Sequence, residues 1–355
     1  RSIWSNVRYC LDNIDYLYPG DGMVNMLPLA HLYGMVVEML HPFCRGMHCH
    51  FLTRLPSPKV IMQAFAEVRP KLIITVPLII EKIVKSKVFP MLERPMMKLM
   101  MHVPFLDDKL YARVKSGLMN VFGGQVREII IGGAALNREV GEFLRKIGFP
   151  VTVGYGMTEC GPLITYTAAD RTRPGTCGQC VTRMEMRVNS SDPLTIAGDL
   201  WVRGMNVMQG YYNNPEATAE VMMGEGWMNT GDMCTIDADG FLTICGRSKT
   251  LILGPSGQNI YPEEIEQKLN NLPYVAESIV IDDHGDLVAL IVPDFDLLAA
   301  EHIDVVDTEK IMADNLAALN KEMPAYSKVK SVEIRDAEFE KTPKRSIKRF
   351  LYQRN

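Results

Sequence analysis

Two short apolar runs that each end in a glycine-rich turn restrict the fold of this chain more than any other feature. The first run covers residues 128–131 and ends in G-G-A-A; the second covers residues 149–153 and ends in G-Y-G. Apolar, β-branched runs of this length predict buried strands. A helix predicted over residues 138–147 separates them, so we expect neighbouring parallel strands whose carboxyl ends build one ligand crevice.

The second turn continues into Thr158 and Glu159, and its residue types suit a nucleotide. Glycine lets a backbone approach a ligand closely, and Tyr155 offers a flat face to a base. Thr158 supplies a hydroxyl for a phosphate, and Glu159 a hard oxygen for Mg²⁺. Read alone, the stretch leaves open an ordinary glycine-rich turn.

The composition is that of an ordinary globular protein with a small net charge. The 355 residues leave room for two or three domains, and 47% hydrophobic with 23% charged residues is ordinary for soluble proteins. A net charge of -4 does not favour nucleic acid. Because no apolar run reaches bilayer length, no signal-peptide core is visible, and eight cysteines follow no disulfide framework, we expect a cytoplasmic protein.

Two groups of metal-ligating residue types have simpler interpretations. Cys177 and Cys180 form a CxxC that no second CxxC or His pair accompanies, which favours a turn over a metal or redox site. A second group crowds one decade of the chain: His41, Cys44, His48, Cys49 and His50. For this group we favour buried, hydrogen-bonded histidines between a helix and a strand.

Up to residue 170, helical and strand patterns alternate at the spacing of an α/β fold. The predicted helices cover residues 4–17, 60–68, 78–85, 92–119 and 138–147, with a further apolar helix ending near residue 39. The predicted strands cover residues 23–27, 71–76 and 128–131, together with the run before the second glycine turn.

After residue 170 the pattern changes to short strands with Gly, Pro and Asp turns, predicted over 185–188, 198–203, 234–236 and 241–245. Within this β subdomain, Asp232 follows a glycine turn, where its carboxylate suits a ribose diol. From about Lys249 a new α+β pattern begins, with helices over 262–272 and 307–323 and strands over 275–282, 287–293 and 329–334.

The predicted fold class is therefore α/β, with a large N-terminal domain followed by a small one. Residues 1–248 form the first part, with parallel sheets, flanking helices and a β subdomain at about 171–246. Residues 249–355 form a small α+β domain.

Several motifs occur in an order that resembles the adenylate-forming superfamily of acyl-CoA synthetases, peptide-synthetase adenylation domains and luciferases. They are P-L-A-H-L-Y-G, G-G-A-A-L, Y-G-M-T-E-C-G-P, G-D-L-W-V-R-G-M-N-V-M-Q-G-Y-Y-N, G-W-M-N-T-G-D, G-R-S-K and N-I-Y-P-E-E-I-E. They extend over nearly the whole chain. The closing F-E-K-T-P-K-R-S-I-K-R-F-L is most similar to long-chain fatty-acid CoA ligases.

The resemblance implies an activity and a set of site residues. A fatty acid and ATP would give an acyl-adenylate and pyrophosphate, with Mg²⁺ bound, and CoA would then displace AMP. The implied nucleotide site comprises Gly132, Gly133, Ala134, Ala135, Tyr155, Gly156, Thr158, Asp232 and Arg247. Glu159 would bind Mg²⁺ and Lys249 would be the interdomain hinge. The implied acyl pocket is bordered by His31, Tyr33, Gly34 and Gly154.

Two departures from the family pattern stand out. The Ser-, Thr- and Gly-rich phosphate-binding loop that ends in Lys is missing, so we expect the C-terminal portion of a longer enzyme that is inactive alone. The family's adenylation lysine falls on Ser346, and a hydroxyl cannot replace an ammonium facing developing negative charge. Lys344 or Lys348 could take its place, and we favour Lys344, which lies in the same loop.

The chain's last fifteen residues leave other interpretations open. Residues 341–355 hold six basic residues and no acid, as in a solvated tail or a patch for CoA or anionic lipid at the inner membrane face. A transfer of the acyl group to a carrier protein, or a nucleotide-binding module that has lost catalysis, are the alternatives to the ligase. Acyl chain length and oligomeric state stay open.

Overall fold

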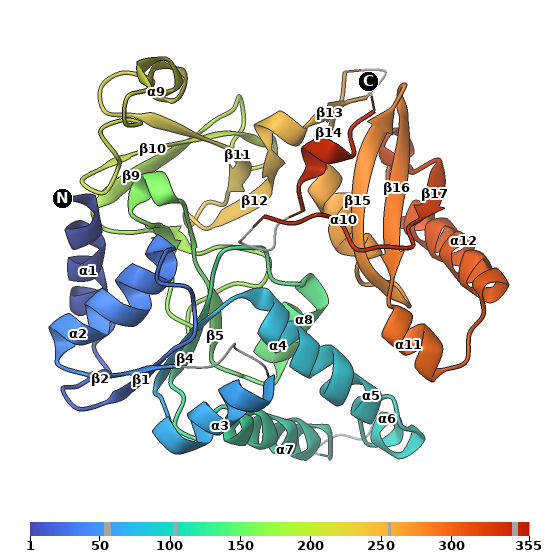
Figure 1. Ribbon diagram of the computed structural model, residues 1–355, viewed down its shortest axis with the longest axis horizontal. Coiled ribbons are helices and arrows are strands. Elements are labelled where there is room, and N and C mark those ends of the chain that lie inside the picture. Colours follow the sequence, from blue (N-terminus) through green and yellow to red (C-terminus); the bar gives the residue numbers. More distant parts are fainter. Residues whose placement is uncertain (53–57, 102–105, 255–256, 343–346, 355) are drawn as a thin grey trace. The chain divides into compact units, whose positions relative to one another are not determined.

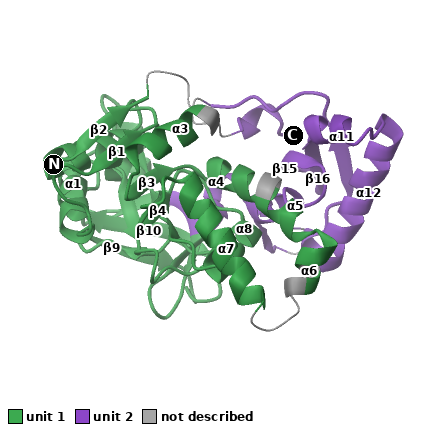
Figure 2. Cartoon of the chain, turned by 90° about the horizontal axis from the view of Figure 1, so that it is seen from below, with its two compact units in different colours: residues 1–230, 234–244 green, residues 231–233, 245–355 purple. Residues whose placement is uncertain are grey.

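The computed structural model of the protein describes residues 1–52, 58–101, 106–254, 257–342 and 347–354. The chain forms two compact units, shown in different colours in Figure 2. Unit 1 comprises residues 1–230 and 234–244, and unit 2 comprises residues 231–233 and 245–355. The predicted α/β class, with parallel sheets and a smaller C-terminal part, is confirmed. Within the described ranges, no helix is long and apolar enough to cross a membrane.

Unit 1 begins with mixed helices and strands (Figure 1). The helical segments up to residue 160 are α1 (Ser2–Asn13), η1 (Gly34–Leu40), α2 (His41–Arg45), α3 (Pro58–Val68), α4 (Pro77–Ile83), η2 (Val84–Val88), α5 (Phe89–Leu92), α6 (Pro95–Met101), α7 (Leu106–Val121), α8 (Arg138–Lys146) and η3 (Thr158–Cys160). The strands in the same part are β1 (Gly22–Asn25), β2 (His48–Phe51), β3 (Leu72–Thr75), β4 (Glu128–Ile131), β5 (Val151–Val153) and β6 (Tyr155–Gly156).

A parallel sheet in the order β3-β4-β5 is the centre of this part. Its side chains alternate between two cores, because successive residues of a strand point to opposite faces. Leu72, Ile74 and Ile130 belong to the core that includes α1. Ile129 and Ile131 belong to the other core, with α3, α7 and α8. Both faces are therefore buried, as the uninterrupted apolar runs predicted.

The helix predicted over residues 4–17 ends earlier, at Asn13. Arg45 explains where it ends, since its guanidinium donates hydrogen bonds to the carbonyl oxygens of Leu11 (2.7 Å) and Ile14 (2.8 Å). These carbonyls belong to the helix end that lacks intrahelical donors. Leu17 is still buried, as the apolar spacing required.

The prediction of buried, hydrogen-bonded histidines is only partly correct. It holds for the burial of His41 but not for its hydrogen bonding, since neither ring nitrogen has a hydrogen-bond partner among the described residues, and it is wrong for His48 and His50. His41 is fully buried, and burial together with the nearby Arg45 lowers its pKa to about 4. His48 and His50 lie exposed on β2, because the strand presents their side chains to solvent. Among the residues placed by the structure, no three His, Cys, Asp or Glu side chains gather as a metal site, and the described cysteines are free thiols.

A β-rich part follows, and its residues belong to unit 1 except for 231–233 and 245–247, which belong to unit 2. Its strands and helix are β7 (Leu163–Tyr166), β8 (Gln179–Cys180), β9 (Met184–Asn189), β10 (Gly198–Gly204), α9 (Pro215–Val221), β11 (Met228–Ile236) and β12 (Leu242–Arg247). They form two sheets, in the orders β6-β7-β8 and β12-β11-β10-β9. The prediction that Asp232 follows a turn is wrong: β11 starts at Met228, and Gly231 adopts a φ of +73° inside the strand without ending it.

Unit 2 contains an antiparallel hairpin, β15 (Val275–Asp283) with β16 (Asp286–Pro293), and β17 (Ser331–Ile334) parallel to β16. Its remaining elements are η4 (Ser248–Thr250), β13 (Ile252–Leu253), β14 (Asn259–Ile260), α10 (Pro262–Leu269), α11 (Phe295–Ala300), α12 (Val305–Glu322), η5 (Ala325–Ser327) and η6 (Arg349–Leu351). One face of the sheet packs on α10 and α12, and the other on Phe339 and Tyr352.

The C-terminal segment is therefore part of the fold of unit 2. Arg354 pairs with Glu333 (2.5 Å) and Asp283 (3.0 Å), Lys341 pairs with Glu277 (2.6 Å), and Arg349 pairs with Glu266. The solvated-tail interpretation is wrong for these described residues, because acids from other elements of unit 2 neutralise them.

Candidate functional site

The candidate site starts where β4 and β5 end. The first loop follows β4, and the N–H of Gly132 donates to the carbonyl of Thr75 at the end of β3 (3.1 Å). The second follows β5, and the N–H of Gly154 donates to the carbonyl of Ile131 (2.9 Å). These bonds continue the ladder of the parallel sheet to its last residues, so both loops leave from the same edge, as predicted.

Tyr33 supports the first loop from behind. A Cβ on Gly132 would lie 2.9 Å from the Cζ atom of Tyr33, so only glycine permits this approach. The Tyr33 hydroxyl donates to the carbonyl of Ile130 (3.0 Å), and burial raises the pKa of Tyr33 well above its usual value. Gly133 adopts a φ of +85°, which turns the loop away from the strand. The structure thus joins a residue of the predicted acyl pocket to the predicted adenine loop.

The second loop folds back at once as the β6-β7 hairpin. A Cβ on Gly156 would lie 1.9 Å from the carbonyl oxygen of Pro162, which excludes any other residue there. The N–H of Met157 donates to that same oxygen (2.8 Å). Tyr155 is half-buried at the start of the hairpin. Thr158 and Glu159 follow in η3, the first exposed and the second half-buried.

A side chain from α1 fixes the turn that carries these two residues. Asn6 donates from its amide to the carbonyl oxygens of Cys160 (2.9 Å) and Gly161 (2.6 Å). Gly161 adopts a φ of +60°, and Cys160 is fully buried below it. The exposed hydroxyl of Thr158 therefore lies on a rigid turn.

Glu159 is held from a second segment that sequence reasoning did not place in the site. Its carboxylate Oε1 accepts a hydrogen bond from the hydroxyl of Tyr211 (2.9 Å), and its carbonyl accepts one from the N–H of Met208 (2.7 Å). Burial and the hydrogen bond to Glu159 raise the pKa of Tyr211 to about 12, so the phenol keeps its proton. The motif G-Y-Y-N was the available signal.

The donor set fits Mg²⁺. This cation prefers hard oxygen ligands and, beside phosphates, is held by only one or two carboxylates. One carboxylate and one neighbouring hydroxyl, Glu159 and Thr158, meet that requirement on a single turn.

The loop over residues 28–34 carries three of the four pocket candidates, and the fourth, Gly154, directly follows β5. His31 and Tyr33 are half-buried and Gly34 is buried, where a Cβ would lie 2.8 Å from the carbonyl oxygen of Pro28. Gly154, at the end of β5, is half-buried and faces the carbonyl of Thr165, 3.3 Å from where a Cβ would stand.

A buried acid, Glu38 in η1, holds the start of this loop. Its Oε2 accepts hydrogen bonds from the N–H groups of Met26 (3.1 Å) and Leu27 (2.9 Å), while its own carbonyl accepts one from the amide of Asn25. Burial raises the pKa of Glu38 to about 8, against the effect of those two hydrogen bonds. Sequence reasoning missed it, although an acid inside the apolar run M-V-V-E-M-L was a visible signal.

In unit 2, Asp232 and Arg247 form an ion pair. The Nε of Arg247 lies 2.9 Å from Oδ1 of Asp232, whose side chain is only 6% exposed, whereas that of Arg247 is 61% exposed. The pair joins β11 to the end of β12, so two residues predicted for the ribose lie together. Lys249 is exposed in η4, where Thr250 donates to Glu263 (2.7 Å). Lys344 and Ser346 lie outside the described residues.

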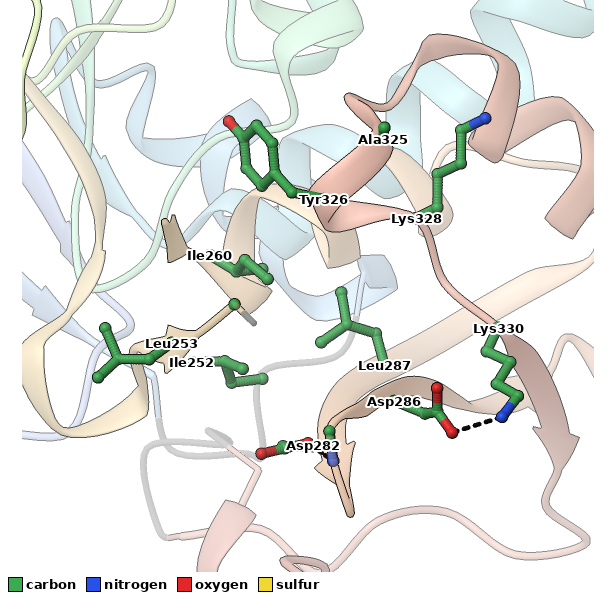
Figure 3. Close-up of a pocket in the computed structure, with 12 residues that line it drawn as sticks. Ile252, Leu253, Ile260, Asp282, Asp286, Leu287, Ala325, Tyr326, Lys328 and Lys330 are labelled. Atoms are coloured by element: carbon green, nitrogen blue, oxygen red, sulfur yellow. Dashed lines mark hydrogen bonds and ion pairs between the residues drawn. The ribbon is translucent and has the colours of Figure 1, made fainter. Parts of the chain in front are cut away.

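Unit 2 also contains a pocket of about 200 Å³ between β13, the β15–β16 hairpin and η5. Figure 3 shows Lys330 paired with Asp286 at its side (2.5 Å), and Leu287 and Ile252 lining it. Ligand pockets usually measure about 300–1,000 Å³. None of the predicted site residues lines this smaller pocket, as far as the described chain shows.

Two family profiles match the chain. The profile described as AMP-binding enzyme covers residues 1–212, and that of the AMP-binding enzyme C-terminal domain covers residues 249–354. Both loops, Thr158, Glu159 and Tyr211 fall within the first match.

Similar curated proteins are CoA ligases. Long-chain-fatty-acid–CoA ligase FadD15 of Mycobacterium bovis is 27% identical over 301 residues, which are 78% of this chain and 48% of that protein. A long-chain-fatty-acid–CoA ligase of Yersinia pestis is 41% identical over 156 residues, 42% of this chain and 27% of that protein. 4-coumarate–CoA ligase 1 of Solanum tuberosum is 31% identical over 280 residues, 75% of this chain and 45% of that protein. The chain spans about half the length of FadD15.

Solved structures show the same fold. ATP-bound MatB from Rhodopseudomonas palustris superposes with a TM-score of 0.74 at 24% identity, covering 99% of this chain and 63% of that one. The o-succinylbenzoate CoA synthetase MenE from Bacillus subtilis, in complex with ATP and magnesium ion, gives 0.73 at 22% identity, covering 98% and 64%. At such identities the likeness concerns the fold alone.

Proposed function

Because this chain belongs to the AMP-binding enzyme family, we propose that it is the C-terminal part of an ATP-dependent acid–CoA ligase that activates a long-chain fatty acid. In the first step the acid's carboxylate attacks the α-phosphorus of ATP, and pyrophosphate leaves. In the second, the CoA thiol attacks the acyl carbonyl, and AMP leaves. The observation that carries this proposal is the pair of glycine-dependent loops at one sheet edge, with Thr158 and Glu159 fixed on the second loop.

For the nucleotide, we assign the base to the backbone of residues 132–135 and to Tyr155. Both loops come from adjacent strands, and the glycines leave their backbones free of side chains. We assign the ribose hydroxyls to Asp232 and Arg247, which already hold one another in place at 2.9 Å. A buried carboxylate paired with an exposed guanidinium offers both an acceptor and a donor to a diol.

For the phosphates, Thr158 would donate its exposed hydroxyl to the α-phosphate, and Glu159 would hold Mg²⁺. The bound cation would supply positive charge opposite the phosphate oxygens. The rigidity of the turn supports this role, since preorganised donors stabilise developing charge without reorganising. Asn6, with two hydrogen bonds to the turn, supplies that rigidity.

For the acyl chain, we assign His31, Tyr33, Gly34 and Gly154 to the pocket wall. Tyr33 contacts the adenine loop as well, through Gly132 and Ile130, so the two substrates would be bound by physically connected parts.

We further assign residues 1–248 to the large domain and residues 249–355 to a small domain that turns about Lys249 between the two steps. The second family profile begins at residue 249, which supports this boundary. Lys344 is our candidate for the ammonium that faces the α-phosphate during adenylation. One crevice could then serve two reactions.

The substrate class has a second candidate. The potato 4-coumarate–CoA ligase aligns with 75% of this chain at 31% identity, a higher identity than FadD15 shows over a comparable length. That observation favours an aromatic acid, whereas the 41% identity to the Yersinia pestis ligase favours a fatty acid.

The test is pyrophosphate release by the complete gene product with ATP, Mg²⁺ and either fatty acids of graded length or 4-coumarate, with and without CoA. We expect release that requires a long-chain acid, and acyl-CoA when CoA is present. Release with 4-coumarate alone would replace the fatty acid by the aromatic substrate. A lack of release with every acid would contradict the ligase proposal.

A further inference from the structure

We propose that Tyr211 is a positioning residue that orients the carboxylate of Glu159 toward Mg²⁺. The inference rests on the proposed function, because Glu159 is the metal ligand only under that proposal. It adds a residue for which the motif pattern alone implied no role.

The hydrogen-bond geometry is specific to one oxygen. Tyr211 donates to Oε1 of Glu159 at 2.9 Å. Within the described chain, no hydrogen bond to Oε2 is seen, so the carboxylate is oriented by one oxygen and available through the other. A phenol suits this purpose because it donates a single hydrogen bond and carries no charge. A lysine in its place would compete with the cation for the carboxylate.

The segment that carries Tyr211 also holds the backbone of Glu159. The N–H of Met208 donates to the carbonyl of Glu159 at 2.7 Å. Main chain and side chain of one residue are therefore both fixed by residues 208–211. Carboxylates that bind metals are usually hydrogen-bonded in this way by residues behind them, and losing such a partner typically costs about 10–100-fold in metal affinity or activity.

Tyr211 is itself fixed by the start of α9. Its N–H donates to Oγ1 of Thr218 (2.9 Å), and Thr218 in turn donates to the carbonyl of Asn214 (2.8 Å). Gly210 allows this approach, since a Cβ there would lie 2.8 Å from Cγ2 of Thr218. Tyr211 is 36% exposed, whereas the next residue, Tyr212, is 93% exposed. The chain thus offers a matched control for Tyr211 at the adjacent position.

The experiment uses the complete gene product and the variants Tyr211→Phe, Tyr212→Phe and Glu159→Gln. Calorimetric titration measures the binding of ATP at saturating Mg²⁺ and of AMP without Mg²⁺. We expect Tyr211→Phe to weaken Mg²⁺-dependent ATP binding about 10-fold while AMP binding and the melting temperature stay unchanged. Tyr212→Phe should change none of these. In the Glu159→Gln background, Tyr211→Phe should have no further effect, since the two residues act as one unit.

The outcomes separate the inference from the proposed function. Unchanged ATP binding in Tyr211→Phe would overturn the inference and leave the function intact. Equal losses of ATP and AMP binding, or a lower melting temperature, would show a structural role and also overturn it. If wild-type ATP binding does not respond to Mg²⁺, or Glu159→Gln leaves it unchanged, the metal role of Glu159 fails and the inference fails with it.

Discussion

Two buried acids of unit 1, Glu128 and Glu38, differ in how completely their carboxyl oxygens are hydrogen-bonded. Glu128 is the first residue of β4, at the amino end of the parallel sheet. Its Oε2 accepts hydrogen bonds from the hydroxyls of Tyr16 (2.8 Å) and Tyr166 (2.7 Å), and its Oε1 accepts one from the N–H of Ala169 (2.7 Å). Glu38 lies beyond the carboxyl end of β1, beside the predicted acyl loop. Its Oε1 is buried and has no hydrogen-bond partner among the described residues.

The difference teaches which end of the α/β layer is devoted to stability. At the amino end, three donors from separate segments give both oxygens of Glu128 hydrogen-bond partners, which ties those segments together there. Past the carboxyl ends, acids keep one oxygen without a partner in the described chain, as do Glu38 and Glu159. Incomplete hydrogen bonding is costly when buried, so it is expected where a function or a ligand compensates for it.

The largest effect on stability should come from replacing Glu128, whose oxygens all have hydrogen-bond partners. Glu128→Ala removes the acceptor for two phenols and one amide, so we expect the free energy of unfolding to fall by about 3–5 kcal/mol. Chemical denaturation of the complete protein measures this. Glu128→Gln, which keeps an acceptor oxygen, should lose much less. Because the site lies at the opposite end of the strand, the KM for ATP of the folded fraction should not change; a raised KM would break the comparison.

Among changes at the carboxyl end of the sheet, Gly156→Ala should reduce activity most. The new Cβ would stand 1.9 Å from the carbonyl oxygen of Pro162, which forces the β6-β7 hairpin and Thr158 to shift. Since a displacement of about 1 Å can cost about 100-fold in rate, we expect pyrophosphate release to fall by about that factor. Gly117→Ala is the control, because a Cβ there meets nothing within 4 Å in the middle of α7. Equal activities of the two variants would refute this account of the hairpin.

Glu38→Gln should remove a pH dependence. Burial raises the pKa of Glu38 in the folded protein to about 8, above that of an ordinary carboxyl, so the folded state binds this proton more tightly. The stability that Glu38 contributes is therefore complete below about pH 4.5 and decreases until the pH passes about 8, by at most about 1.4 kcal/mol per pH unit. Denaturation from pH 5 to 9 should show that the wild type loses stability relative to Glu38→Gln. Parallel profiles would mean that Glu38 is not protonated in the fold.

The smallest effect on stability is expected at Arg247, the exposed partner in the Asp232–Arg247 ion pair proposed for the ribose. Arg247 is 61% exposed, so Arg247→Ala should change the free energy of unfolding by less than about 1 kcal/mol. The KM for ATP should nevertheless rise about fivefold, since a donor to the ribose is lost. The matched variant is Arg203→Ala, another arginine paired with an acid, Glu185 (2.6 Å), with a side chain 37% exposed, and it should leave the KM unchanged. A similar KM increase in both variants would indicate a general charge effect.

The sequence predicted the parts of the fold that depend on local pattern. β3, β4 and β5 were predicted because their apolar runs are uninterrupted, and α8 because its apolar face repeats at helical spacing. The early end of α1 was not predictable, since it depends on Arg45, more than thirty residues away. The start of β11 was missed because a glycine normally signals a turn, whereas Gly231 stays within the strand.

The sequence proposed the residue types of the candidate site but not the side chains that hold them in place. The glycines, Thr158 and Glu159 could be singled out from the sequence because each residue type has its own chemistry. Glu38, Glu128 and Tyr211 act through partners 11 to 112 residues away, which no spacing rule connects. Tyr33 was predicted as a pocket residue, and its packing under Gly132 emerged only from the structure.

The most direct test is a crystal structure of the complete gene product with a non-hydrolysable acyl-adenylate analogue. The account predicts the base against residues 132–135 and Tyr155, with the phosphate at Thr158 and a cation on Glu159. A nucleotide bound elsewhere, for example in the pocket beside Leu287 and Ile252, would contradict the claim that the carboxyl end of the sheet is the active site.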